Sequence, residues 1–176
     1  VAKAVAPGVW TIPGGMRPDR QPDGNTVVFE APEGLVVVDT GRHDWHRASI
    51  LRLARERERP VVAIVNTHWH LDHVSGNPAL RSAYPDLRVY ASDAIDGALK
   101  GFLATSAQES VGYLDDPQLP ATIREDIRAD VATIRNGAAL RPDVVISASA
   151  VMNIGGRKLG IRLATHAVTA GDVWLY

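Results

Sequence analysis

The feature that most constrains this chain is a continuously apolar run that leads almost directly into a dense group of metal-binding side chains. Val61–Val65 consists mostly of β-branched residues, which is typical of a strand buried on both faces of a layered α/β protein. Residues 68–73 then read His-Trp-His-Leu-Asp-His. Four potential ligands within six residues are far too dense for an ordinary surface loop. The sequence therefore predicts a metal site on a loop at the end of a buried strand.

The spacing of this segment predicts which side chains share a metal ion. In extended chain leaving a strand, residues two apart point the same way, so His68 and His70 can bind one ion. Asp72 has the same parity, and His73 can turn to the other side, so these two can bind a second ion. The chain has no cysteine, so any metal must be held by imidazole and carboxylate, which zinc accepts.

Zinc lowers the pKa of a bound water to about 7 and so generates hydroxide at neutral pH. Two zinc ions about 3.5 to 4 Å apart could share this nucleophile, and Asp72 could orient it as the catalytic carboxylate. The prediction is a dinuclear zinc site whose hydroxide attacks a carbonyl or a phosphoryl group of a small-molecule substrate.

The sequence around the cluster predicts alternating strands and helices. Residues 25–30 and 35–39 are β-rich and are separated by the turn sequence 31–34, which predicts a hairpin. Asp44 is expected to cap a helix that stops at Pro60. A short helix from Asn77 to Tyr84 and a strand over 87–91 complete an α/β alternation.

The second half of the sequence predicts two helices between Asp93 and Asn136, joined by the loop 113–120. Strands are expected over 144–147, 151–154, 158–163 and 173–176, with Gly155-Gly156 as a hairpin turn, which begins a second sheet. The strand that reaches Tyr176 would leave an unpaired edge, so we expect unseen C-terminal residues. Residues 1–176 are interpreted as one domain.

Composition limits the partners of the chain. A net charge of -1 with mixed acids and bases offers no basic stripe for phosphates, so nucleic acid is not expected as a partner. No apolar run approaches the roughly 20 residues that span a bilayer, so no membrane segment is expected. The start at Val1 favours a processed periplasmic or secreted protein, with a cytoplasmic chain as the alternative. No oligomeric state is predicted.

Two other histidines receive structural interpretations. His46 falls on the buried face of the helix after Asp44, so packing is its expected role. His43 follows Asp39-Thr40-Gly41 at another strand end and is interpreted as a solvated loop histidine rather than a ligand.

The segment Thr67-His68-Trp69-His70-Leu71-Asp72-His73, followed by Gly76, resembles the H-x-H-x-D-H signature of the metallo-β-lactamase superfamily. Residues 25–29 and the segment 35–41, which ends in Asp-Thr-Gly, are similar to the hairpin and strand that precede it. The resemblance implies an αββα sandwich of two sheets between helical layers, with the metals at one rim and the second half incomplete here. It assigns His68 and His70 to the first metal and Asp72 and His73 to the second. Asp39 would be a rim residue that either orients a ligand or caps its turn.

The family's third histidine for the first metal precedes a T-x-G-[DS] turn, which residues 169–172 resemble, but Val168 occupies the histidine position. His166 lies two residues earlier, displaced by about 6.6 Å in extended chain, and is either the metal ligand or an ordinary strand or loop histidine. The family's later bridging Asp and final His do not occur before Tyr176.

The resemblance implies a zinc hydrolase of an ester, thioester, lactone or amide, with a β-lactam as one possible amide. Two alternatives stay open. One is a degenerate or fragmentary member without catalysis, and the other is an iron-dependent oxygenase of the same superfamily.

Overall fold

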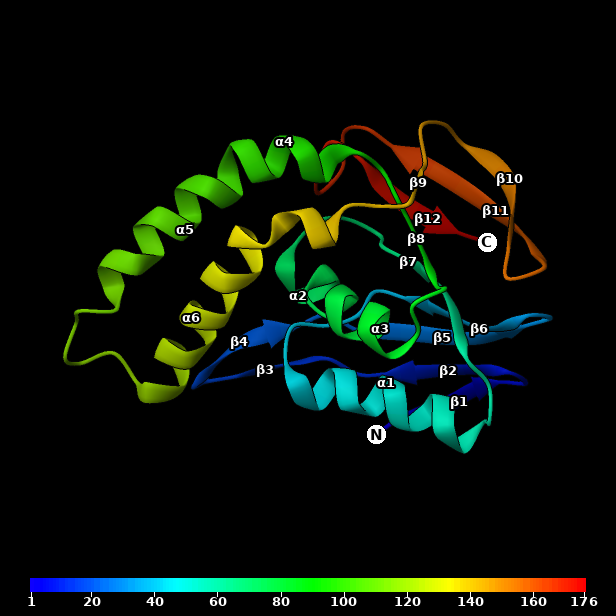
Figure 1. The fold of residues 1–176 in the computed structure, drawn as a ribbon, viewed down its shortest axis with the longest axis horizontal. Helices are drawn as coiled ribbons and strands as arrows, with labels where there is room; N and C mark the ends of the chain where they lie inside the picture. Colours follow the sequence, from blue (N-terminus) through cyan, green and yellow to red (C-terminus); the bar gives the residue numbers. More distant parts are fainter.

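The computed structural model describes all residues 1–176 and contains three β-sheets and six α-helices (Figure 1). The largest sheet has seven strands in the order β1-β2-β5-β6-β7-β8-β9. Its strands are β1 (Lys3–Ala6), β2 (Val9–Ile12), β5 (Thr26–Ala31), β6 (Gly34–Val38), β7 (Val61–Val65), β8 (Arg88–Ala91) and β9 (Val144–Val145).

The first half of this sheet is antiparallel and the second half is parallel. β5 and β6 form the predicted hairpin, with Val27 opposite Val38. β6, β7, β8 and β9 then run parallel to their neighbours. Parallel neighbours need crossover connections, which are supplied by α1 (Asp44–Glu56), by α2 (Leu71–Val74) with α3 (Asn77–Ala83), and by α4 (Ala94–Lys100), α5 (Phe102–Tyr113), α6 (Ala121–Arg135) and the 3₁₀ helix η1 (Gly137–Leu140).

A second sheet of three antiparallel strands packs against the first. It consists of β10 (Ala150–Ile154), β11 (Arg157–Ala164) and β12 (Asp172–Leu175), with the tight turn at Gly155-Gly156 between β10 and β11. Both glycines have positive φ, 62° and 82°, which is the backbone that glycine favours. Three of the four strands predicted for the second sheet are therefore confirmed. The expectation for residues 144–147 was wrong, because only Val144–Val145 form a strand, β9, and it pairs with β8 in the large sheet.

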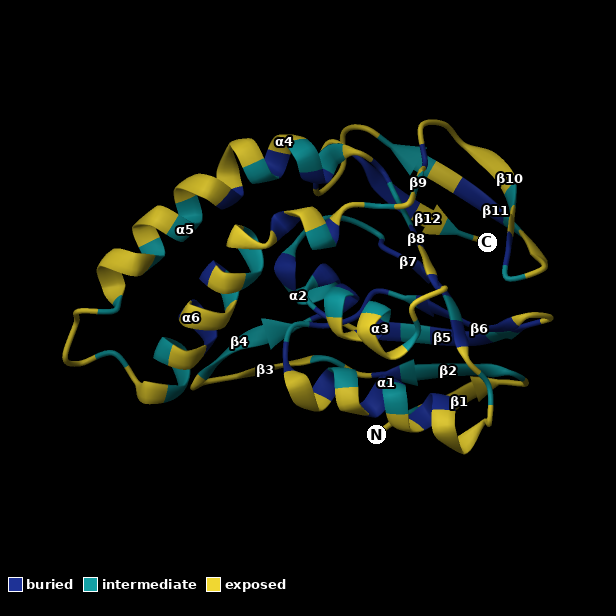
Figure 2. Ribbon diagram, in the orientation of Figure 1, coloured by how far each residue is buried: buried dark blue, intermediate teal, exposed yellow.

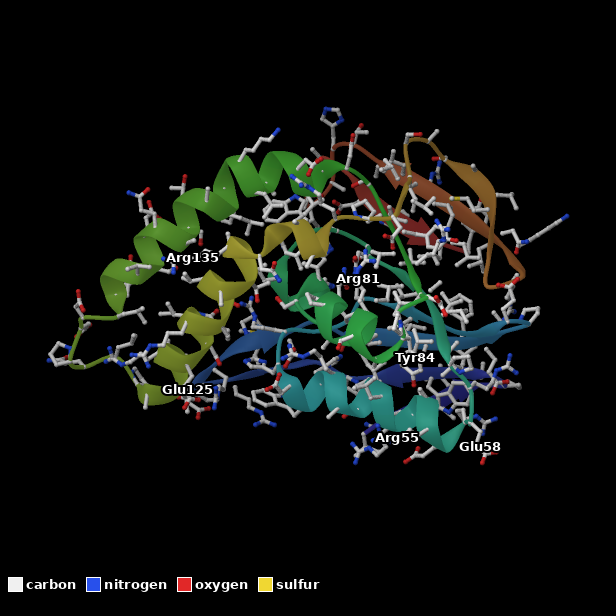
Figure 3. All side chains as sticks on the ribbon, viewed as in Figure 1. Arg55, Glu58, Arg81, Tyr84, Glu125 and Arg135 are labelled. Carbon is white, nitrogen blue, oxygen red and sulfur yellow. The ribbon has the colours of Figure 1, made fainter.

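Two apolar cores lie on opposite faces of the large sheet. One joins the sheet to α1 and α3, and includes Ile50, Leu53, Ile64 and Leu80. The other lies between the two sheets. Arg55 of α1 and Glu58 just after it are exposed and point away from the sheet (Figure 3), so the amphipathic helix has its polar face in water.

The layers are thus helix, sheet and sheet, which confirms the α/β sandwich. The outer face of the three-stranded sheet is open to solvent, where Val151 is 68% and Trp174 59% exposed, so a second helical layer is not present within residues 1–176. A groove of about 740 Å³ opens between the sheets and is bordered by Phe29, Val38, Thr67, Val173 and Leu175. None of the helices has the length and apolar character needed to cross a membrane.

Several expectations for individual elements were wrong. The stretch from Asp93 to Asn136 contains three α-helices rather than two, because Gly101 breaks the first of them from the second. His43, not Asp44, is the residue before α1, and it makes no side-chain capping bond. The strands β1, β2, β3 (Gly15–Arg17) and β4 (Arg20–Asp23) were not predicted, since their residues show little alternation of apolar and polar side chains.

Candidate metal centre

The histidine cluster lies where β7 ends at the parallel half of the large sheet, as predicted. After Val65 the chain leaves the sheet through Asn66 and Thr67 and enters the single turn α2 at Leu71. His70 directly precedes this turn, so Asp72 and His73 are helical rather than extended. The prediction that side chains alternate as in an extended chain as far as Asp72 is therefore wrong. The helical turn sets the directions of the Asp72 and His73 side chains.

Three imidazole rings of the cluster lie close together. The ring centroids of His68 and His73 are 4.2 Å apart, and those of His68 and His70 are 4.6 Å apart. Burial lowers the pKa of His68, and the neighbouring rings of His73 and His70 lower it further. His68 is thereby kept neutral near pH 7, which is the form of imidazole that binds a metal.

Asp39, at the end of β6, holds His73 in place. Its Oδ2 bonds with Nδ1 of His73 at 2.7 Å and also accepts the hydroxyl of Thr67 at 2.7 Å. Oδ1 accepts the backbone N–H of Thr67 at 2.8 Å. The structure thus supports the orienting role of Asp39, because a carboxylate on one ring nitrogen leaves the other free for a metal.

The second nitrogen of His73 faces Asp72. His73 Nε2 lies 3.3 Å from Asp72 Oδ2. Burial alone would lower the pKa of His73, but the carboxylates of Asp39 and Asp72 outweigh it and raise the pKa to about 9. Burial would raise the pKa of Asp72, but the bond and charge of His73 lower it. In the metal-free chain the two side chains are an ion pair.

The backbone fixes this segment from both sides. Thr40 N–H donates to His73 O at 2.8 Å, and Gly24 N–H donates to Asp72 O at 3.0 Å. From the second sheet, Val173 N–H donates to Thr67 O at 2.7 Å. The cluster is therefore held by loops that follow β4, β6 and β7, and by the first part of β12.

The donor set of the cluster has the chemistry of a zinc site but not yet its geometry. No three His, Asp or Glu side chains among residues 1–176 are arranged around one point as metal ligands. The chemistry of the set nevertheless fits zinc, since it supplies neighbouring imidazoles, a carboxylate and a carboxylate-supported histidine. The assignment of His68, His70, Asp72 and His73 to metals stays a prediction.

His166 is not brought into this cluster. Its side chain is exposed, and its ring Nδ1 bonds with the hydroxyl of the adjacent Thr165 at 3.0 Å. The following turn is built as the sequence suggests, because Asp172 accepts the N–H groups of Val168 and Thr169 at 3.0 and 2.8 Å. The role of His166 as a ligand stays a prediction that its position in this structure does not favour.

The other two histidines differ in outcome. His46 is buried, with 2% exposure, and bonds with Thr26 Oγ1 at 2.7 Å, which confirms its packing role. The expectation of a solvated His43 was wrong, because this side chain is only 7% exposed. Its Nδ1 bonds with Asp23 at 2.6 Å, and its Nε2 lies 3.2 Å from Asp126 of α6. These carboxylates are distant in sequence, so no local motif signals the pairing.

The fold and the cluster together define an α/β sandwich protein that carries a His-x-His-x-Asp-His segment at a parallel strand end. The model of the metallo-β-lactamase superfamily matches residues 20–176. The chain belongs to this superfamily.

Among known proteins, the chain is 30% identical over 123 residues to a linear primary-alkylsulfatase of Pseudomonas sp., covering 64% of this chain and 23% of that protein. It is 40% identical over 72 residues to a hydroxyacylglutathione hydrolase of Gloeobacter violaceus, covering 41% of this chain and 27% of that protein. The chain therefore spans about a quarter of the length of these relatives, which are hydrolases by name.

Solved structures share the fold. A metallo-β-lactamase from Pontibacter korlensis superimposes with a TM-score of 0.63 at 18% identity, covering 100% of this chain and 66% of that chain. The sec-alkylsulfatase Pisa1 from Pseudomonas sp. gives a TM-score of 0.65 at 20% identity, covering 99% of this chain and 29% of that chain. At these identities the likeness shows the fold alone.

Proposed function

We propose that this chain carries the metal-binding part of a zinc-dependent hydrolase that acts on an acyl compound of low molecular weight. The observation that carries the proposal is the packing of His68, His70 and His73 at the end of β7, with His73 anchored by Asp39. His68 and His70 would hold one zinc ion, and Asp72 and His73 a second. When bound, zinc supplies Lewis acidity and lowers the pKa of water toward neutrality.

The side chains of the cluster have distinct roles in this proposal. Asp39 fixes the ring orientation of His73, and the hydroxyl and N–H of Thr67 fix Asp39. Asp72 would bind the second zinc ion through its carboxylate, which could also orient an attacking water and accept a proton from it.

The relatives favour an acyl substrate. They include hydroxyacylglutathione hydrolases and an atrochrysone carboxyl ACP thioesterase of Aspergillus fumigatus, which supports a thioester or an ester over a lactone or a β-lactam amide. The alkylsulfatase, which matches the largest share of the chain among these relatives, makes sulfate-ester hydrolysis the second candidate.

The test measures bound metal and turnover on the same preparation. Zinc per chain is determined by elemental analysis, and hydrolysis is followed with a chromogenic acetate ester, a thioester, 4-nitrophenyl sulfate and a chromogenic β-lactam. We expect about two bound zinc ions and ester or thioester turnover that chelator abolishes. His68→Ala should lose turnover and about one of the two zinc ions. Asp96→Asn, which alters an exposed ion pair with Arg141, is the control.

Other results point to the alternatives. A chain that takes up no zinc and hydrolyses none of these substrates would be a non-catalytic member, and the proposal would be wrong. A chain that binds one iron and consumes oxygen would be an oxygenase. Preferred turnover of 4-nitrophenyl sulfate would select the sulfatase.

A further inference from the structure

Trp69 connects the histidine cluster to an exposed aromatic side chain outside it. The residue lies between His68 and His70 in sequence, and its ring centroid is 4.7 Å from that of His70 in an edge-on arrangement. On its other side it lies 5.7 Å from the ring of Phe102, the first residue of α5. Phe102 is 67% exposed, so the row of aromatic rings that begins at the cluster ends at the surface of the molecule.

Trp69 is held from behind by a small apolar core. It packs against the buried cluster that contains Leu71, Val74, Ile95 and Leu103. Leu103 is the neighbour of Phe102, so the same core that holds Trp69 also anchors the start of α5. The start of α5, which carries Phe102, is therefore anchored beside Trp69. The ring surface of Phe102 that stays in water would be buried favourably against an apolar partner.

α5 is a largely exposed helix with a single charged residue. Glu109 is its one charged residue and Leu103 its one buried residue, and Figure 2 shows most of the helix as exposed. Tyr113 at its far end is 62% exposed. The exposed residues Thr105 and Gln108 keep part of its outer face polar. At the end beside Trp69, Phe102 leaves a large apolar side chain in water, and exposed apolar surface of this kind is typical of a binding site.

We propose that Trp69 and Phe102 form an apolar wall that receives the hydrocarbon chain of the substrate while its scissile bond lies at the histidine cluster. This deepens the proposed function and rests on it. The position of Trp69 identifies the occupant of this wall. Trp69 belongs to the ligand segment itself, so a group that contacts both rings extends from the cluster. The substrate class is a medium-chain acyl ester or thioester rather than an acetyl compound.

The first test compares kcat/KM for 4-nitrophenyl decanoate and 4-nitrophenyl acetate. The native chain should prefer decanoate, and Phe102→Ala should lower the decanoate-to-acetate ratio roughly tenfold, mostly through KM, because it removes an apolar contact. Trp69→Phe, which keeps an aromatic ring, should lower the ratio less. Tyr113→Ala, an equally exposed aromatic on the same helix, should leave the ratio unchanged. An unchanged ratio in Phe102→Ala would overturn the proposal.

The second test needs no turnover. Calorimetry measures the binding of decanoate and acetate to the metal-free chain, and Phe102→Ala should weaken decanoate binding roughly tenfold, whereas Tyr113→Ala should not. If decanoate binds Phe102→Ala as tightly as it binds the native chain, its binding site lies elsewhere, as in the groove between the sheets. This result would contradict the proposed wall.

The two tests separate the wall from the hydrolase. If neither ester is hydrolysed but decanoate binding depends on Phe102, the proposed function fails and the wall stands. If zinc-dependent hydrolysis occurs with the same ratio and the same decanoate binding in Phe102→Ala, the wall fails and the proposed function stands.

Discussion

Asp39 shows how one buried carboxylate can serve the backbone and the candidate site together. It is 3% exposed, has a positive φ of 61°, and bonds with both Thr67 and His73. Asp and Asn tolerate this left-handed backbone better than most residues. Replacement by Asn would therefore remove the charge while the backbone keeps its path.

Asp39→Asn should weaken zinc binding by about 10- to 100-fold, because the carboxylate no longer supports the ligand nitrogen of His73. Competition against a chromogenic chelator measures the affinity. Asp96→Asn, which alters an exposed ion pair, should bind zinc as the native chain does. Unchanged affinity in Asp39→Asn would mean that His73 does not hold a metal.

Gly24 gives a steric test of the same ring. A Cβ at this position would lie 2.7 Å from Cε1 of His73 and 2.8 Å from the backbone oxygen of Asp72. Gly24→Ala should therefore displace His73, lower the free energy of unfolding by about 1 to 3 kcal/mol and weaken zinc binding. Urea unfolding and chelator competition measure the two effects.

The matched control is Gly97→Ala. A Cβ there meets no atom within 4 Å, and the residue lies within α4, so this change should stabilise the chain by about 0.5 to 1 kcal/mol. Equal behaviour of the two alanine variants would contradict the close packing of Gly24 on His73.

At the scale of elements, α6 is attached to the rest of the molecule through charged groups. Asp126 is buried, and it accepts the Arg20 guanidinium and the Gln21 N–H, both at 2.8 Å. His43 Nε2 lies 3.2 Å from the same carboxylate, and one helical turn further along, Asp130 pairs with Arg42. Glu125 is the exposed member of the group (Figure 3). These contacts join α6 to β4 and to the start of α1.

The stability that this attachment gives the folded chain should depend on pH. Burial alone would raise the pKa of Asp126, but the Gln21 N–H, Arg20 and His43 lower it overall. A lowered pKa in the folded state adds stability above the unfolded value of about 3.9 and loses it as the pH falls below that value. Asp126→Asn should therefore be less stable than the native chain at pH 6, by about 1 to 3 kcal/mol.

Urea midpoints at pH 6, 5, 4 and 3 measure this difference, which should shrink at the acid end. Asp115→Asn changes an exposed carboxylate in the loop between α5 and α6, and its midpoints should follow those of the native chain. A constant difference between Asp126→Asn and the native chain over the series would show that the charge of Asp126 has no part in it.

The elements differ in how far the sequence predicts them. β7, the hairpin of β5 and β6, and the strands of the second sheet follow from apolar runs and turn residues, which are local signals. The attachment of α6 does not, because Asp23, His43 and Asp126 pair only after distant segments have packed together. The prediction of the H-x-H-x-D-H segment at a strand end was confirmed for the same local reason, whereas the path of the chain through Asp72 depends on the turn α2.

At the scale of the whole molecule, metal binding should appear as added stability. A ligand that binds only the folded chain stabilises it by about 2.7 kcal/mol at a concentration of 100 times its Kd. Zinc should therefore raise the Tm of the native chain and chelator should reverse this rise. His68→Ala, which keeps only Asp72 and His73 as the second pair of ligands, should show a smaller rise. A scanning fluorimetry series of zinc concentrations measures the shift. A Tm that is indifferent to zinc would contradict the proposed metal site.

The sandwich as a whole was predicted through the family resemblance rather than from local pattern alone. The sequence predicts that two sheets form. The contact between them depends on residues such as Phe29 and Ile161, which are far apart in sequence. The exposed outer face of the second sheet could not be predicted either. Alternation of side chains along a strand predicts which residues share a face, but not what packs against that face.

The hydrogen bond from Val173 to Thr67 also bears on the order in which the chain is synthesised. Residues 61–73 are synthesised before β12, so the bonds between Asp39 and the cluster can form earlier than the bond from the second sheet. Contacts between segments this distant form slowly. A chaperone or a metal donor that acts during translation would meet the histidines on a loop that is held from one side only.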